Sequence, residues 1–175
     1  MDDVGGRFLG ASPTQHSGSG PLLTLNLGVV VQPYRSFDLV PGEKRRKKGA
    51  TIPVTTADVA KYLEDEYGVM QVFARVHWDD ITKALAGSVE GALEALLMGQ
   101  RVDPFGRGLQ SIQTRFRRFI SSYEAERVGI PGTPTKAALR GVNHRLKHPF
   151  AQGNPRRPSF RDTGTYQTSF RAWVT

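Results

Sequence analysis

Two histidines, His144 and His148, have the four-residue spacing that places both imidazoles on one face of a helix, as in zinc-binding helices. Their surroundings argue against a metal. Asn143, Arg145 and Lys147 occupy positions where a metalloprotease needs a glutamate, and nearby positive charge opposes binding of a dication. We therefore predict two polar surface histidines in a basic segment and no metal site.

The carboxylates best placed for acid–base chemistry are Asp79 and Asp80, with Glu64, Asp65 and Glu66 upstream. Adjacent residues on a helix point in different directions, so neither group predicts a converging pair. Helix capping and a solvated acidic face explain both groups. No Gly-x-Ser-x-Gly turn presents a serine, and the glycine-rich stretches lack phosphate-loop or dinucleotide-loop endings. The sequence predicts a protein that is not an enzyme and holds no cofactor.

Positive charge is the property that the chain concentrates. The net charge is +8, and no acid occurs between Glu126 and Asp162. Such charge attracts nucleic acid, an anionic membrane surface or an acidic protein. The candidate basic residues for contact with DNA or a partner are Lys44, Arg45, Arg46, Lys47, Lys48, Arg140, Arg145, Lys147, Arg156, Arg157 and Arg161.

The stretch 155–161 alternates arginines with an aromatic residue. This composition suits gripping a phosphate backbone. It equally suits an exposed arm that docks on acidic side chains of a neighbouring subunit. Because the sequence shows no known nucleic-acid-binding fold, docking on a neighbour is the favoured interpretation.

Length and composition predict one domain with arms. The chain has 175 residues, of which 38% are hydrophobic, with 19 Gly, 11 Pro and no Cys. We expect a flexible N-terminal arm at 1–21 and a single domain at 22–175, which includes a basic loop at 41–50 and an extended segment at 149–162. The absence of cysteine suits a reducing compartment, and no secretory signal or membrane-spanning run is visible.

Three segments predict a small antiparallel sheet. Residues 22–31 and 165–174 alternate apolar and polar side chains, which is typical of half-buried strands. The short apolar run 69–76 fits either a third strand or a close link between helices. The expected fold class is α+β, with a helical middle packed on this sheet.

Helices are expected between the strands. Thr55 and Asp58 approximate a capping box at the start of the first helix, and Gly68 suits its end. The second runs from Asp79 to Gly99 with an apolar stripe, in which Gly87 and Gly91 predict a close contact with another helix.

The third helix has its stripe from Leu109 to Tyr123 and is expected to end at Gly129. A short fourth helix is expected to start with Thr133 as N-cap and Pro134 at the first helical position. It is expected to run through Leu139, Val142 and Leu146.

The C-terminal segment resembles a pattern of phage neck and tail-completion proteins. In that pattern a Pro precedes an apolar residue, followed by Thr-Gly, a large apolar residue and a Ser before the apolar residue that begins a strand. Residues 59–64 and the following Tyr67-Gly68 also look like virion-morphogenesis proteins. The matching residues are Pro158, Phe160, Thr163, Gly164, Tyr166, Ser169 and Phe170.

The resemblance implies a virion structural subunit that forms a homo-oligomeric ring at the head-to-tail joint and has no catalytic role. Its implied partners are copies of itself, a portal-side connector and the tail tube or sheath, with transient contact to packaged DNA and none to membrane. It would be synthesised in the host cytoplasm. The matching residues and Trp173 are expected to dock neighbouring subunits. The alternative is a sequence-independent nucleic-acid-binding protein.

Overall fold

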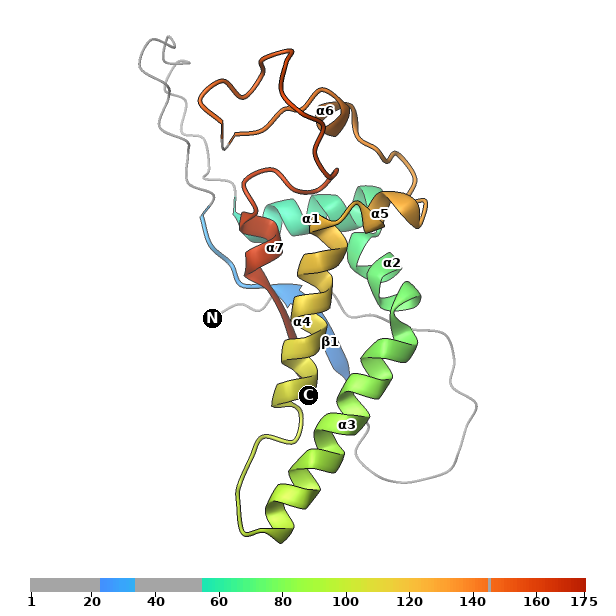
Figure 1. The fold of residues 1–175 in the computed structure, drawn as a ribbon, viewed down its shortest axis with the longest axis vertical. Helices are drawn as coiled ribbons and strands as arrows, with labels where there is room; N and C mark the ends of the chain where they lie inside the picture. The colour runs from blue at the N-terminus through green and yellow to red at the C-terminus, as the bar shows by residue number, and fades with distance from the viewer. Residues whose placement is uncertain (1–22, 34–54, 145) are drawn as a thin grey trace.

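The computed structural model describes residues 23–33, 55–144 and 146–175 (Figure 1). The predicted arm at 1–21, the basic loop at 41–50 with Lys44 to Lys48, and Arg145 lie outside the described residues. The elements are β1 (Leu25–Val29), α1 (Thr56–Tyr67), α2 (Val69–Val76), α3 (Trp78–Leu97), α4 (Gly106–Ser121), α5 (Glu124–Arg127), α6 (Lys136–Leu139), α7 (Thr165–Ser169) and β2 (Phe170–Val174).

The two strands form a small antiparallel sheet, and the predicted α+β class is confirmed. Leu25 lies opposite Val174, and Val29 lies opposite Phe170. Gly28 provides room for the half-buried Trp173, since a Cβ at Gly28 would lie 2.9 Å from the indole ring. The sheet therefore joins segments from the two ends of the described chain.

Helix α4 contributes more buried apolar side chains to the core than any other described element, as its apolar stripe predicts. Ile112, Phe116, Phe119 and Ile120 are all buried. Phe116 stacks on Phe170 of β2, with ring centroids 3.8 Å apart and an interplanar angle of 13°. These contacts pack α4 directly against the C-terminal strand.

Local signals set the ends of α1 as predicted. The Thr55 hydroxyl accepts a hydrogen bond from the Asp58 amide at 3.2 Å, and the Asp58 carboxylate accepts one from the Thr55 amide at 2.8 Å. Gly68 adopts φ 58° at the C-terminal end. The Glu64 carboxylate then accepts hydrogen bonds from the Met70 amide at 2.7 Å and the Gln71 amide, which satisfies the first turn of α2.

Two segments of the expected sheet form helices in the structure, one of them only in its first half. Residues 69–76 form α2, because Val69, Met70 and Phe73 recur at helical spacing and are all buried on one face. In the C-terminal run, residues 165–169 form the short helix α7, and the strand begins only at Phe170. Gly164, with φ 85°, redirects the chain into that helix.

The ends of the later helices also differ from expectation. Helix α4 stops at Ser121, where Tyr123 takes φ 61° and α5 begins, well before Gly129. Thr135, and not Thr133, caps α6, accepting a hydrogen bond from the Ala138 amide at 3.2 Å. Helix α6 ends at Leu139, so the predicted continuation to Leu146 is wrong.

Helices α3 and α4 cross at an unpredicted glycine. A Cβ at Gly108 would lie 2.8 Å from the Ala84 carbonyl oxygen and 3.1 Å from the Leu85 Cα. At Gly87 and Gly91 a Cβ would meet nothing within 4 Å, so the predicted close contact at those two positions is wrong. Residues 86–97 of α3 therefore continue for roughly 18 Å past the crossing point.

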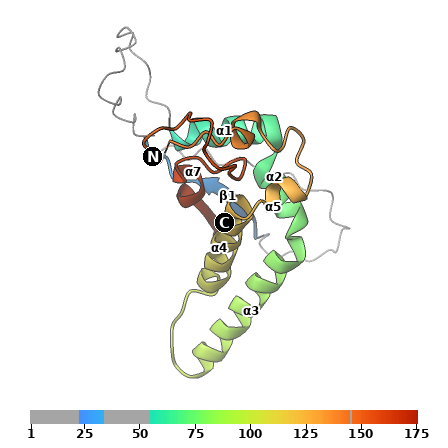
Figure 2. The same cartoon turned by 45° about the horizontal axis from the view of Figure 1, so that its top comes forward.

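The described chain is elongated. The C-terminal end of α3 and the loop that connects it to α4 form one end of the molecule. Helix α6 and its flanking loops form the opposite end (Figures 1 and 2). The sheet, α7 and α4 lie between them. Among the described helices, none combines the length and apolar content that a bilayer crossing requires.

Candidate functional site

The acid-free segment, residues 127–161, is held by the acid at each of its borders. At the first border, the Glu126 side chain is 6% exposed and forms an ion pair with Arg156. Its Oε1 accepts hydrogen bonds from the Ser159 amide at 3.0 Å and the Ser159 hydroxyl at 2.6 Å. Arg156 therefore already has a carboxylate partner within its own chain.

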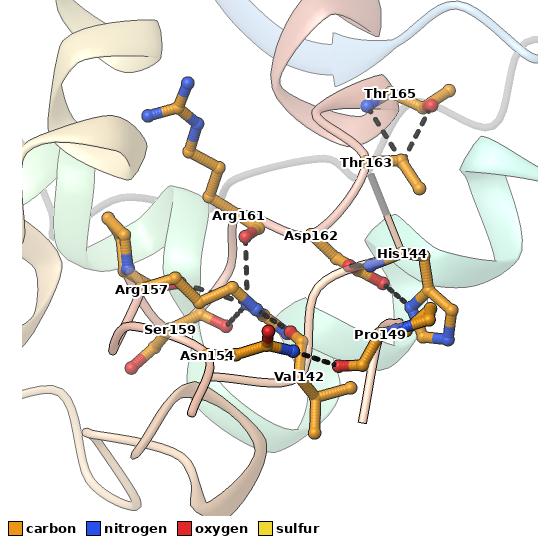
Figure 3. A network of polar contacts seen from close by, with 11 residues as sticks. Val142, His144, Pro149, Asn154, Arg157, Ser159, Arg161, Asp162, Thr163 and Thr165 are labelled. Carbon is orange, nitrogen blue, oxygen red and sulfur yellow. Dashed lines mark hydrogen bonds and ion pairs between the residues drawn. The ribbon is translucent and has the colours of Figure 1, made fainter. Parts of the chain in front are cut away.

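At the second border, Asp162 holds His144 (Figure 3). One carboxylate oxygen accepts a hydrogen bond from the His144 amide at 2.9 Å, and the other lies 2.6 Å from His144 Nδ1. The backbone carbonyl of His148 accepts a hydrogen bond from the Asn154 side chain. Neither histidine lies on a helix, so the spacing of zinc-binding helices is not realised.

Arg157 lies at the centre of a network of hydrogen bonds within the acid-free segment (Figure 3). Its Nε donates to the Val142 carbonyl, and its Nη1 donates to the carbonyls of Pro158, Ser159 and Arg161 at 3.1, 3.2 and 2.9 Å. Burial lowers the pKa of Arg157 from its ordinary value, and the nearby Asp162 opposes that shift. The guanidinium thus folds its own loop and is not free for a polyanion.

Gly141 allows the two halves of the segment to touch. It has φ 66°, and a Cβ there would lie 2.4 Å from the Asn154 carbonyl oxygen and 2.7 Å from that of Pro155. These are overlaps with backbone atoms, which cannot rotate away. The stretch 149–162 is consequently packed on its own chain, and the prediction of a free, extended arm is corrected.

The outer surface of this segment combines bases with apolar side chains. Lys136, Arg140 and Lys147 are exposed and have no carboxylate of the described residues within ion-pair distance. Leu139 is 53% exposed and Phe150 is 69% exposed. A hollow of about 500 Å³ is lined by Arg140, Val142, Phe150 and Gln152. We call this surface the basic face: Lys136, Leu139, Arg140, Lys147 and Phe150.

Most of the residues predicted to dock a neighbour lie inside the subunit. Phe160 is 8% exposed, Tyr166 3%, and Phe170 and Ser169 are fully buried. Pro158 and Gly164 are also buried, and Thr163 and Trp173 are half-buried. Docking is therefore replaced by a structural role, in which Phe160 packs on Tyr67 and Phe170 packs on Phe116.

The local geometry of the Thr-Gly turn is as expected. Gly164 has φ 85°, and the Thr163 hydroxyl accepts a hydrogen bond from the Thr165 amide at 3.3 Å. Tyr166 and Phe170 follow as buried residues on either side of the α7–β2 boundary. The motif thus turns the chain and seats the last strand in the core.

An arginine groove runs along the outer side of α4. The helix contains no Asp or Glu, and Arg107, Arg115 and Arg118 recur on its outward side. Together with Arg127 they line an open groove of about 700 Å³, which also contains Glu124. Arg115 is paired with Asp80 at 2.7 Å, whereas Arg107 and Arg118 have no ion-pair partner among the described residues. The sequence did not predict this groove, because its lining forms only where α5 folds beside α4.

A second polar cluster surrounds the buried His77. Its Nε2 lies 3.2 Å from a Glu124 carboxylate oxygen, and its Nδ1 lies 3.7 Å from Asp80, which also pairs with Arg115. The ring packs on Phe73 with centroids 5.0 Å apart. The two carboxylates face opposite ring nitrogens, so the cluster joins the α2–α3 junction to α4 and α5. Within the described ranges, no three acidic or imidazole groups could hold a metal ion.

The end of α3 exposes an apolar surface. Leu93 is 57% exposed, Leu96 61%, Leu97 90%, Met98 78% and Val102 50%. We call these five residues the apolar tip. The apolar residues predicted from the sequence include Leu93, Leu96 and Leu97, but not Met98 and Val102. Ile81 lies in the core and Leu85 packs against it, while the tip lies beyond.

Comparisons of the chain with protein-family models, with curated proteins and with solved structures find no match.

Proposed function

We propose that the chain is a structural subunit of a tailed-phage virion that forms an oligomeric ring at the head-to-tail joint. The Pro158 to Phe170 pattern supports this class of protein. In the proposed ring the subunit contacts copies of itself, a portal-side connector and the tail tube or sheath. Its role is to join these parts, without catalysis and without a cofactor.

The observation that carries the proposal is the apolar tip. Leu93, Leu96 and Leu97 recur at helical spacing, as a buried face does, yet they and the adjoining Met98 and Val102 are exposed. Contiguous exposed apolar surface of this kind marks a protein–protein contact. A subunit that is completed by neighbouring copies fits this arrangement.

The proposal is tested by deleting the gene from the phage that encodes the chain. We expect filled heads and finished tails to accumulate unjoined in electron micrographs, and to join again when the chain is supplied in trans. Mass spectrometry of purified wild-type particles should detect the chain. Normal joined particles from the deletion mutant would refute the proposal.

The arginine groove supports a second candidate function, sequence-independent binding of nucleic acid. Arginines gathered on one side of an acid-free helix, with short polar side chains between them, allow close approach of a phosphate backbone. Residues 107 and 118 are separated by roughly 16 Å along the helix. That length suits several consecutive phosphates.

Fluorescence anisotropy with labelled duplex DNA tests this second function. Contact through the three groove arginines other than Arg115 predicts a slope of log affinity against log salt of roughly −3. Arg107→Gln and Arg118→Gln should each reduce its magnitude by about 1, whereas Lys61→Gln, at an exposed position of α1, should not. Equal binding by all variants would exclude the groove as the DNA site.

A further inference from the structure

The apolar tip and the basic face lie at opposite ends of the long axis (Figures 1 and 2). We propose that the apolar tip of one copy docks on the basic face of the next copy, so that subunits join head to tail. This inference rests on the proposed function and names the two surfaces that would connect its subunits.

The charges of the two surfaces are complementary. Glu90 and Glu94 are exposed on the part of α3 beyond the crossing with α4, and α3 carries no base after Lys83. The basic face belongs to a segment without any acid, in which Lys136 and Arg140 are exposed. Opposite charges on two surfaces steer their encounter and fix their register.

The spacing of these charges also matches. Glu90 and Glu94 are four residues apart on α3, so they lie on one side of the helix, about 6 Å apart along its axis. Lys136 opens α6 and Arg140 caps it in a helical conformation, which gives the same separation. Two helices laid side by side would therefore bring both acids opposite both bases.

The apolar parts provide the matching contact. Leu97 and Met98 are the most exposed large apolar side chains of the described residues. On the other surface, Leu139 and Phe150 flank Arg140, and Phe150 lines the hollow beside it. Seating the leucines of the tip against Leu139 and Phe150 would remove apolar area from water on both copies.

The occupant is a second copy for two physical reasons. Glu90 and Glu94 lie beside the apolar tip and repel nucleic acid, which disfavours a phosphate backbone as its partner. The tip and the basic face are too far apart to meet within one chain, and each is unused there. Two different surfaces that fit one another form a heterologous contact, which generates a ring when the rotation between copies closes.

Sedimentation velocity of the full chain over a range of concentrations tests the inference. We expect the wild type to self-associate reversibly. Leu97→Ser with Met98→Ser, the tip variant, should weaken association by more than about tenfold, as should Phe150→Ser with Arg140→Glu, the face variant. Val31→Ser removes an exposed apolar side chain outside both surfaces and should leave association unchanged. All of these side chains are exposed, so melting temperatures should stay close to wild type.

Mixing the two defective variants gives the sharper test. The face variant keeps an intact tip and the tip variant keeps an intact basic face. Equimolar mixing should therefore produce one-to-one dimers that grow no further. Charge reversal provides a second test, since Glu90→Lys with Glu94→Lys should abolish association, and adding Lys136→Glu with Arg140→Glu to the same chain should restore it.

Three outcomes would overturn the inference. These are a wild type that stays monomeric at high micromolar concentration, a face variant that still dimerises, and mixed variants that remain monomeric. None of them bears on the deletion phenotype, which tests the proposed function separately. A chain that joins heads to tails but associates through other surfaces would refute the inference alone.

Discussion

The segment 158–174 and the second half of α3 both carry regularly spaced apolar side chains. Most of these side chains are buried in the first region and exposed in the second. In the first, Phe170 is fully buried and stacks on Phe116. In the second, Leu93, Leu96 and Leu97 recur at helical spacing, yet Leu97 is 90% exposed. Both patterns indicate an apolar face, and only one of these faces is covered by this chain.

The difference arises from where α4 meets α3. Gly108 brings the first turn of α4 against Ala84 and Leu85, so the residues of α3 beyond that point have no helix alongside. The C-terminal segment instead returns to α4 and pairs with β1. Periodicity therefore indicates an apolar face, whereas topology decides whether the subunit itself covers that face.

The largest expected effect separates the two regions directly. Phe170→Ala should lower the free energy of unfolding by about 3–5 kcal/mol, because it leaves a cavity among the core aromatics. Leu97→Ala should change the stability of the monomer by less than about 0.5 kcal/mol, because its side chain is exposed. Urea unfolding at low protein concentration measures both. Similar losses for the two variants would show that the tip is covered within the chain.

Substitutions at two glycines test how tightly the acid-free segment is folded. Gly141 and Gly129 both have positive φ, but only Gly141 lies against other backbone atoms. Alanine at either position lowers the free energy of unfolding, because an L side chain is strained in the left-handed conformation. At Gly141 the overlap with the Asn154 carbonyl should lower it by about 1–3 kcal/mol more. Urea unfolding of the two variants measures this difference. Equal effects would indicate a loosely attached segment, closer to the arm predicted from the sequence.

Glycines of α3 and α4 provide an opposite pair of expectations. Gly87→Ala and Gly91→Ala should each stabilise the monomer by about 1 kcal/mol, because the added methyl meets nothing and the helix gains propensity. Each should raise the melting temperature by roughly 2–4 °C. Gly108→Ala should lower it, because its Cβ would overlap the Ala84 carbonyl. A loss of stability at Gly87 would mean that the α3 extension has a partner within the chain.

The smallest effect concerns the first turn of α1. Hydrogen bonds from the Thr55 hydroxyl and amide hold the pKa of Asp58 below its usual value. A lowered pKa means that the ionised carboxylate stabilises the fold above the pKa of the unfolded chain, and that this stabilisation is lost as the pH falls below about 4. The melting-temperature difference between wild type and Asp58→Asn should therefore shrink from pH 6 to pH 3. A constant difference would contradict the assigned cause.

Features that depend on a few neighbouring residues were predictable from the sequence. The capping box at Thr55, the left-handed glycine at Gly68 and the Thr163-Gly164 turn are local hydrogen-bond and backbone preferences. The stripe of α4 and the α+β class follow from periodicity. These predictions hold because the atoms concerned lie within one or two turns of chain.

Features that depend on distant contacts were decided by the tertiary structure alone. The sequence assigned Phe160, Tyr166 and Phe170 to docking, but their pairing with Tyr67 and Phe116 buries them. The sequence predicted that Arg157 is available to a partner, but the fold brings the Val142 carbonyl beside it, where it accepts a hydrogen bond from Arg157. Residue type and spacing determined which groups are apolar or charged. Which partner each group meets depends on how far α4 overlaps α3 and where the acid-free segment folds back, because burial and ion pairing are properties of three-dimensional proximity.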